Sequence, residues 1–372
     1  MKKCVAFAGS FLLLLSMAGC SNTDEQIPLE PIPVPIELSV SDLNDILAAL
    51  DLSEATLSYH GKVDNICDAS SAIRADNYIE NLQRFTWEEY LPPDGWDGSY
   101  EYRCVLTTPS VTLTAYRGNS EATRLLRVTT DNGEGMFTLP YITDEDSGNA
   151  IQMNWMIFDT FKQWYDEAHT ASLNRETGTP LTAEELDWFT DYTTTEQVYY
   201  DEPQDSNHIY STEISCFFTS YYEDVAELDF EEWMRYFPGD GSGNSVTEEE
   251  FEALKNVGVW PFKEFESFDS MPVPIHKYFR STVDAALTKY AGITTADLDT
   301  SSVAYLAEYD SFYTYTSDFG PGWFIPCYGE RNGDTVTLWE APAGDNMVSD
   351  TLVLQKNSGN WHILSHQPAT IS

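Results

Sequence analysis

The end of the chain carries the pattern that most constrains its fold. Residues 334–340, 351–356 and 361–366 are rich in the β-branched, aromatic and other apolar residues that favour strands. Asn332-Gly333 precedes the first of these segments, and residues 357–360, Asn-Ser-Gly-Asn, join the last two. Turns this short connect only neighbouring antiparallel strands. The sequence therefore predicts an antiparallel meander at its C-terminal end.

Helical patterns precede this meander. Two capping boxes, which mark the starts of helices, are formed by the pairs Thr182–Glu185 and Thr247–Glu250. A further helix is predicted from the apolar spacing of residues 283–290, and Gly292 ends it. Residues 171–180 are polar and contain glycine and proline, so we place a domain boundary there. Residues 180–372 are expected to form an α+β domain.

The preceding part of the chain also combines strands with helices. An amphipathic helix is expected first, with its apolar face formed by Leu43, Ile46, Leu47 and Leu50. Strands are expected at 55–63, 100–106, 111–116, 125–129 and 136–142. A long helix follows, whose buried side is predicted to be Met153, Met156, Ile157, Phe161, Trp164 and Ala168. The fold class is therefore α+β, with residues 38–172 as an N-terminal domain whose antiparallel sheet is packed by helices.

The N-terminus has the three parts of a secretory signal peptide. Two lysines follow the initiator methionine, an apolar run extends from Val5 to Leu15, and small residues precede Cys20. Residues 1–19 are predicted to be removed, which places the mature chain outside the membrane. Residues 20–37 contain four prolines, and we expect them to form an extended tether.

Residues 15–20, Leu-Ser-Met-Ala-Gly-Cys, resemble the lipobox of bacterial lipoproteins. The resemblance implies that Cys20 is acylated by diacylglycerol and becomes the first residue of the mature protein. The lipid would then hold the protein at the extracytoplasmic face of the cell membrane. The alternative is a plain N-terminal membrane anchor, although an apolar run of about 11 residues is short for a ~30 Å hydrocarbon core.

The charge of the chain excludes some classes of partner. There are 61 acidic and 19 basic residues, so the formal net charge is −42. Such a field repels nucleic-acid phosphates and anionic lipid headgroups. We therefore expect no nucleic-acid binding, and we expect the membrane to be contacted through the N-terminal lipid alone. The aromatic content of 14% is high enough to build packed cores.

Export bears on the cysteines, because disulfides persist outside the cytoplasm. Cys67 and Cys104 both fall in the N-terminal domain, and a disulfide between them is one expectation. Cys216 and Cys327 offer a second pair in the C-terminal domain. The other expectation is that each thiol is a small buried hydrophobic group.

Several segments of the C-terminal half are similar to a known group of proteins. They are residues 181–189, 217–224, 228–230, 289–292 and 305–310. Their order and spacing resemble uncharacterised surface lipoproteins of gut-type anaerobic Gram-positive bacteria over residues 181–366. The resemblance implies an extracytoplasmic location and the extent of the domain, and it identifies no catalytic residue. Helices followed by a meander that closes on a Gly-Asn-Trp turn also look like the NTF2-like fold.

One loop has the ligand spacing of a calcium site. Oxygen-bearing side chains recur at even spacing in Asp240, Ser242, Asn244 and Glu248. An EF-hand loop gathers its ligands in this way, but its sixth position is glycine and its twelfth is glutamate. Ser245 and Phe251 stand at those two positions here. The pattern fits either a Ca²⁺ site or a solvated loop.

A second candidate site combines aromatic rings with carboxylates. Its members are Tyr305, Glu308, Tyr309, Asp310 and Tyr313. Rings can stack on sugar faces, so we expect a non-catalytic module that binds an extracellular ligand, a glycan or a peptide. The alternative is a hydrolase acting on a polysaccharide or cell-wall polymer, with Glu308 and Asp310 as its acids. A third reading is a purely structural surface protein.

Overall fold

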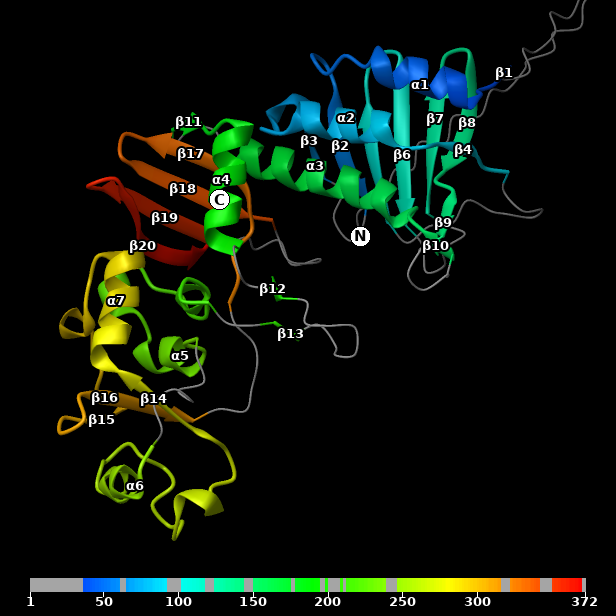
Figure 1. Cartoon of the computed structure of the whole chain (residues 1–372). Coiled ribbons are helices and arrows are strands. Elements are labelled where there is room, and N and C mark those ends of the chain that lie inside the picture. Colours follow the sequence, from blue (N-terminus) through cyan, green and yellow to red (C-terminus); the bar gives the residue numbers. More distant parts are fainter. Residues whose placement is uncertain are drawn as a thin grey trace, which may run out of the picture. The chain divides into compact units, whose positions relative to one another are not determined.

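Two separate sheets, each with helices packed against it, account for most of the structure (Figure 1). The computed structural model describes residues 36–372 apart from 61–64, 92–101, 118–123, 144–149, 175–177, 195–197, 200–207, 210–211, 239–245, 316–321, 342–349 and 370–372. The signal peptide, Cys20 and most of the expected tether therefore lie outside the described residues. Its last two residues, Ile36 and Glu37, belong to the first strand, so the tether was predicted to end too late.

The first sheet has eight strands, which are β1 (Ile36–Glu37), β2 (Thr56–His60), β3 (Asn65–Asp68), β4 (Glu88–Glu89), β5 (Tyr102–Thr107), β6 (Val111–Arg117), β7 (Leu125–Thr130) and β8 (Gly133–Thr138). They lie in the order β1-β8-β7-β6-β5-β2-β3, and β4 also pairs with β8. All pairs are antiparallel except β1 with β8. Asp131 and Asn132 form the short connection from β7 to β8.

Helix α3 (Trp155–Asn174) crosses this sheet and contacts β2, β3, β5, β6 and β7 (Figure 1). Of the predicted apolar face, Ile157, Phe161, Trp164 and Ala168 are fully buried. Met153 and Met156 are only partly buried, and Met153 precedes the helix. The Trp164 indole nitrogen donates to the carbonyl of Ala69 at 2.9 Å. Helices α1 (Val40–Ala48) and α2 (Ala75–Arg84) contact each other and add Leu43, Leu47 and Leu82 to the same core. A hairpin of β9 (Tyr141–Thr143) and β10 (Ala150–Gln152) precedes α3.

The second sheet contains the predicted meander. Its five strands are β11 (Thr179–Pro180), β17 (Pro326–Asn332), β18 (Thr335–Glu340), β19 (Asp350–Asn357) and β20 (Asn360–Pro368). They lie in the order β11-β17-β18-β19-β20, and every pair is antiparallel. The meander of β18, β19 and β20 is confirmed, while β11 and β17 are additional strands that the sequence pattern did not indicate.

The remaining elements lie between β11 and β17 in the sequence. They are α4 (Ala183–Thr194), β12 (Val198–Tyr199), β13 (His208–Ile209), α5 (Phe230–Arg235), α6 (Glu248–Leu254), β14 (Ile275–Phe279), α7 (Arg280–Ala291), β15 (Ala304–Leu306) and β16 (Ser311–Tyr315). Short 3₁₀ helices are η1 (Ala69–Ser71), η3 (Ser215–Phe218), η4 (Val225–Glu227), η5 (Phe268–Ser270) and η6 (Thr295–Asp297). Strands β14, β16 and β15 form a three-stranded antiparallel sheet. The described part of the chain is thus mixed α+β.

The helix boundaries that position the second sheet follow from local chemistry. At α4 the Thr182 hydroxyl accepts the Glu185 amide at 3.2 Å, and the Glu185 carboxylate accepts the Thr182 amide at 2.9 Å. The same exchange between Thr247 and Glu250 opens α6, so both predicted capping boxes are confirmed. Gly292 ends α7 in the left-handed conformation, as expected.

Cys67 and Cys104 are both free thiols, which corrects the expectation of a disulfide between them. Cys67 of β3 lies opposite Leu57 of β2, whereas Cys104 of β5 lies opposite Tyr59 of β2. The two cysteines are therefore at least two strand spacings apart, about 10 Å. A disulfide requires Cα atoms within about 7 Å. Burial raises the pKa of the Cys67 thiol to about 12, and burial also raises that of Cys104.

The free thiols can be counted. A protein that begins at residue 20 and carries Cys20→Ser retains four cysteines. We expect Ellman's reagent to titrate all four after unfolding without a reductant, and to react slowly with the native protein because the buried thiols stay protonated. Cys327, which is partly exposed, should react first. Two thiols in the unfolded protein would contradict the structure.

Candidate functional site

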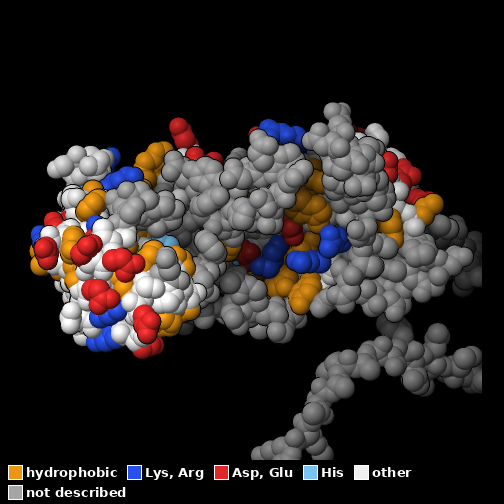
Figure 2. All heavy atoms as spheres, turned by 60° about the horizontal axis from the view of Figure 1, so that its bottom comes forward, with side chains coloured by type: hydrophobic (Ala, Val, Ile, Leu, Met, Phe, Trp, Pro, Cys, Tyr) orange, Lys and Arg blue, Asp and Glu red, His pale blue; other side chains and the backbone are white. Residues whose placement is uncertain are grey.

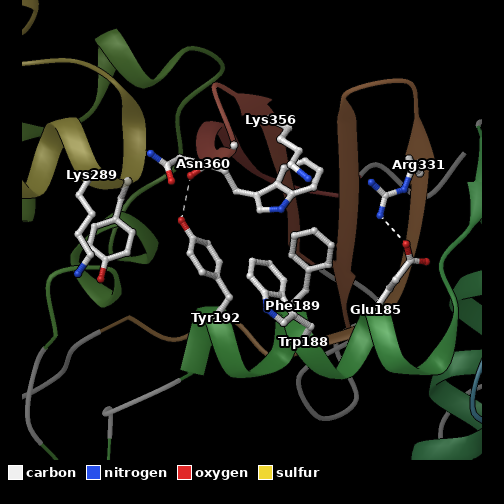
Figure 3. A pocket seen from close by; sticks show the side chains of 11 residues that line it. Glu185, Trp188, Phe189, Tyr192, Lys289, Arg331, Lys356 and Asn360 are labelled. Atoms are coloured by element: carbon white, nitrogen blue, oxygen red, sulfur yellow. Dashed lines mark hydrogen bonds and ion pairs between the residues drawn. The ribbon is translucent and has the colours of Figure 1, made fainter.

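A cavity of about 500 Å³ lies between α4, α7 and the β19–β20 hairpin (Figure 3). Five of its lining residues are aromatic and three are basic. The lining residues are Glu185, Trp188, Phe189, Tyr192, Lys289, Tyr290, Arg331, Lys356, Gly359, Asn360 and Trp361. Ligand cavities are of this size and are lined mainly by apolar groups with a few polar ones.

Helix α4 supplies one wall of the cavity. Trp188, Phe189 and Tyr192 project from α4 toward the strands in Figure 3. Trp188 and Phe189 are consecutive, and Tyr192 follows them by four and three residues. The three side chains therefore lie on one side of the α-helix. The rings of Trp188 and Tyr192 are nearly parallel, with 11° between their planes and 5.4 Å between their centroids. Because Trp188 is 49% exposed, part of its ring is accessible at the cavity while it stacks on Tyr192.

Close packing holds α4 against the sheet. Leu181, just before α4, lies so near β17 that a Cβ atom at Gly329 would come within 2.6 Å of its side chain. The Leu181 amide also donates to the Gly329 carbonyl at 2.9 Å. Phe189 is 2% exposed and meets Trp361 of β20 edge-on, with 5.1 Å between ring centroids. The Tyr192 hydroxyl donates to the Trp361 carbonyl at 3.0 Å, so α4 is tied to β20 at two points.

The hairpin that forms the second wall depends on a two-residue turn. Ser358 and Gly359 have φ angles of 51° and 94°, the positive values that a tight hairpin turn requires. This turn pairs Lys356 of β19 directly with Trp361 of β20. The Lys356 ammonium consequently lies 5.6 Å from the centroid of the Trp361 ring. Such a contact between a cation and an aromatic face is attractive.

The other two basic residues come from β17 and α7. The Arg331 guanidinium lies 5.7 Å from the Trp361 ring centroid and forms a 2.7 Å ion pair with Glu185. The hydrogen bond from the Thr182 amide and the charge of Arg331 lower the pKa of Glu185. Lys289 lies 4.4 Å from the Tyr290 ring centroid and 3.2 Å from a Glu213 oxygen. Glu185 is thus already engaged as a cap and as an ion-pair partner.

The sequence-predicted aromatic site lies elsewhere. Its residues belong to the β15–β16 hairpin, where the Tyr305 hydroxyl donates to Asp310 at 2.5 Å. Tyr313 is 1% exposed and donates to Glu250 at 2.6 Å, within the core between α6 and this sheet. Tyr309 lies near the Lys277 ammonium, and Glu308 is exposed in the turn. The hairpin brings Tyr305 and Asp310 together, but none of the five residues lines the cavity described above.

The predicted calcium loop is largely outside the described residues. Asp240, Ser242 and Asn244 are not described, and Glu248 is the exposed first residue of α6. Among the described residues, there is no group of three or more His, Cys, Asp or Glu that could hold a metal ion. The described helices also include none that is long and apolar enough to cross a membrane.

Comparison of the chain with protein-family models, curated proteins and solved structures gives no match. The cavity must therefore be judged from its own residues. Sequence reasoning missed Arg331, Lys356 and Trp361, which come together only through strand pairing. The one local signal was the Trp188–Tyr192 pair at helical spacing, because the cap at Thr182 already fixes where α4 begins.

Glu340, at the end of β18, is a further carboxyl group with unusual properties. Burial, together with the charge of Asp350, raises its pKa to about 7. The Ile325 amide donates to the Glu340 carboxylate at 3.1 Å, which opposes that rise only in part. Burial therefore favours the protonated form of Glu340.

The turn between β19 and β20 allows a test of how the cavity wall is built. We expect Gly359→Ala to lower the free energy of unfolding by about 1 kcal/mol, because a Cβ atom disfavours positive φ. Ser358→Gly should instead raise it by about 0.5 kcal/mol, because the strain at that position is relieved. Urea unfolding measures both variants. If both variants lost the same amount of unfolding free energy, this account of the turn would be contradicted.

The raised pKa of Glu340 predicts a pH dependence of stability. Its folded pKa of about 7 lies above the ordinary glutamate value, so the folded state binds this proton more tightly. The associated stabilisation is complete below about pH 4.5 and is lost as the pH rises through 7. Glu340→Gln, which keeps the hydrogen-bond acceptor, should therefore flatten the fall in unfolding free energy between pH 5 and 8 by about 1–3 kcal/mol. If the unfolding free energies of the parent protein and Glu340→Gln, measured in urea, changed in parallel with pH, this assignment to Glu340 would be refuted.

Proposed function

We propose that this chain is a lipid-anchored, extracytoplasmic protein whose folded part binds a glycan without turning it over. The cavity between α4, α7 and the β19–β20 hairpin is the proposed site. The observation that carries the proposal is the half-exposed Trp188 ring, stacked on Tyr192, at the edge of an aromatic-lined cavity. One face of a pyranose ring carries mainly C–H groups, which pack on the negative face of an aromatic ring.

The chemistry of the lining supports binding over hydrolysis. Glycosidases use two carboxyl groups that flank the bond to be cleaved. The cavity lining holds one carboxylate, Glu185. Its oxygens already accept a hydrogen bond from the Thr182 amide and form an ion pair with Arg331. Burial raises the pKa of the Tyr192 hydroxyl, so this group stays neutral and keeps its hydrogen bond to the Trp361 carbonyl.

The location rests on the sequence of the N-terminus. The apolar run, the small residues and Cys20 support export and acylation, and the prolines of residues 20–35 support a tether between lipid and folded part. Membership of the group of Gram-positive surface lipoproteins is proposed on the resemblance over residues 181–366.

We also propose that residues 38–172 and 180–372 are two domains and that the second is NTF2-like. The separate hydrophobic cores of the two sheets support the division. A helix packed on an antiparallel sheet, with a cavity between helix and hairpin, supports the NTF2-like comparison. A fold of this kind does not identify a ligand by itself.

The alternative function is a hydrolase acting on a polysaccharide or cell-wall polymer. Glu340 supports it better than Glu308 and Asp310 do, because a general acid needs a carboxyl group with a raised pKa. Asp350 supplies a neighbouring carboxylate, whose charge contributes to that rise. Release of reducing ends from a cell-wall polysaccharide, lost in Glu340→Gln, would support this alternative.

Glycan binding at the cavity can be tested with a matched pair of exposed tryptophans. An array of oligosaccharides identifies a bound glycan, and calorimetry then measures its affinity. We expect Trp188→Ala to weaken that affinity about tenfold, because about 1.4 kcal/mol of ring packing is lost. Trp155→Ala, which removes another exposed tryptophan on α3, should leave the affinity unchanged. Equal effects of the two variants, or binding of no glycan, would overturn the proposed site.

A further inference from the structure

The charge of the cavity is opposite to that of the chain. The chain as a whole carries a formal charge of −42, and acidic side chains are scattered over the face shown in Figure 2. The cavity lining nevertheless holds three of the 19 basic residues and a single acidic one. At physiological ionic strength, charges farther than about 8 Å are largely screened. The charges closest to an anion inside the cavity therefore matter most, and they include the three basic lining residues.

The three basic residues are not equivalent. Arg331 is paired with Glu185, and Lys289 is paired with Glu213, so each already has a carboxylate partner. Lys356 forms no ion pair with any described residue and is exposed at the cavity. In Figure 3 its side chain extends into the space above Trp188 and Phe189. Lys356 is thus the cation that can take a new carboxylate partner.

Lys356 is also held in place before any ligand arrives. Its position opposite Trp361 is set by the register of β19 and β20, and its ammonium group lies over the Trp361 ring. Contact with the ring restricts the otherwise flexible lysine chain. Restricting a side chain in its binding conformation reduces the entropy lost when a ligand binds.

From this arrangement we infer that the cavity selects acidic saccharides, whose sugar rings carry a carboxylate. The sugar ring packs on Trp188, and the carboxylate pairs with Lys356 across the cavity. A neutral sugar makes only the first of these contacts. The inference rests on the proposed glycan-binding function and adds the substrate class and the residue that determines it.

The test compares charged sugars with uncharged sugars of the same shape. The probes are uronic acid trisaccharides of the gluco and galacto series and a sialyl trisaccharide, each with its methyl ester. Isothermal titration calorimetry measures the dissociation constants for the protein that begins at residue 20 with Cys20→Ser. We expect at least one acid to bind about tenfold more tightly than its ester.

Variants of Lys356 assign the selectivity. Lys356→Gln should reduce the affinity for the acid to that for the ester, without changing the affinity for the ester. Lys356→Arg should retain most of the preference. Lys263→Gln, which removes an exposed lysine outside the cavity, should have no effect. Thermal melts of all variants confirm that they fold.

The outcomes separate the two proposals. Equal affinity for acids and esters, or a preference that survives in Lys356→Gln, overturns the inference and leaves glycan binding intact. Binding of neutral glycans alone also overturns the inference and leaves glycan binding intact. If no saccharide binds and only peptides do, both the inference and the proposed function are overturned.

Discussion

The candidate site depends on the register between β19 and β20. A turn of two residues with positive φ leaves one way to pair these strands, and that pairing sets Lys356 against Trp361. A slip of one residue would move both side chains to the opposite face of the sheet. The cation contact at Trp361, the edge-on packing with Phe189 and the hydrogen bond from Tyr192 all follow from this pairing. The cavity wall is therefore a consequence of turn geometry.

A highly acidic chain can still build a local site for anions, because burial and ring contacts act over short distances. Arg331 and Lys356 both lie over the Trp361 ring, which is 9% exposed and belongs to the core of the second sheet. The same ring thus stabilises the fold and positions two cations.

Much of the secondary structure was predictable, because its signals are local. The caps at Thr182 and Thr247, the buried face of α3 and the meander of β18 to β20 all follow from residues close together in sequence. Strand β17 was missed because proline, glycine and two charged residues interrupt its pattern, although Glu330 within it is 2% exposed. The aromatic residues near Tyr309 were favoured as a site because ring density alone does not distinguish a core from a surface. Tyr313 proved to be core, and Trp188 proved to be exposed.

The sequence by itself determined the α+β class, most helix positions, the longer strands of the first sheet and the C-terminal meander. It also led to the expectation of export with acylation at Cys20. Tertiary structure alone decided which rings face a cavity and which thiols remain free. It also decided which cation of the cavity lacks a carboxylate partner among the described residues. Arg331 and Glu185, for example, are 146 residues apart in sequence yet form an ion pair. Periodicity and capping signals extend over one or two turns of chain, so they contain no information about such contacts. Only packing of the helices on the sheets brings these residues together.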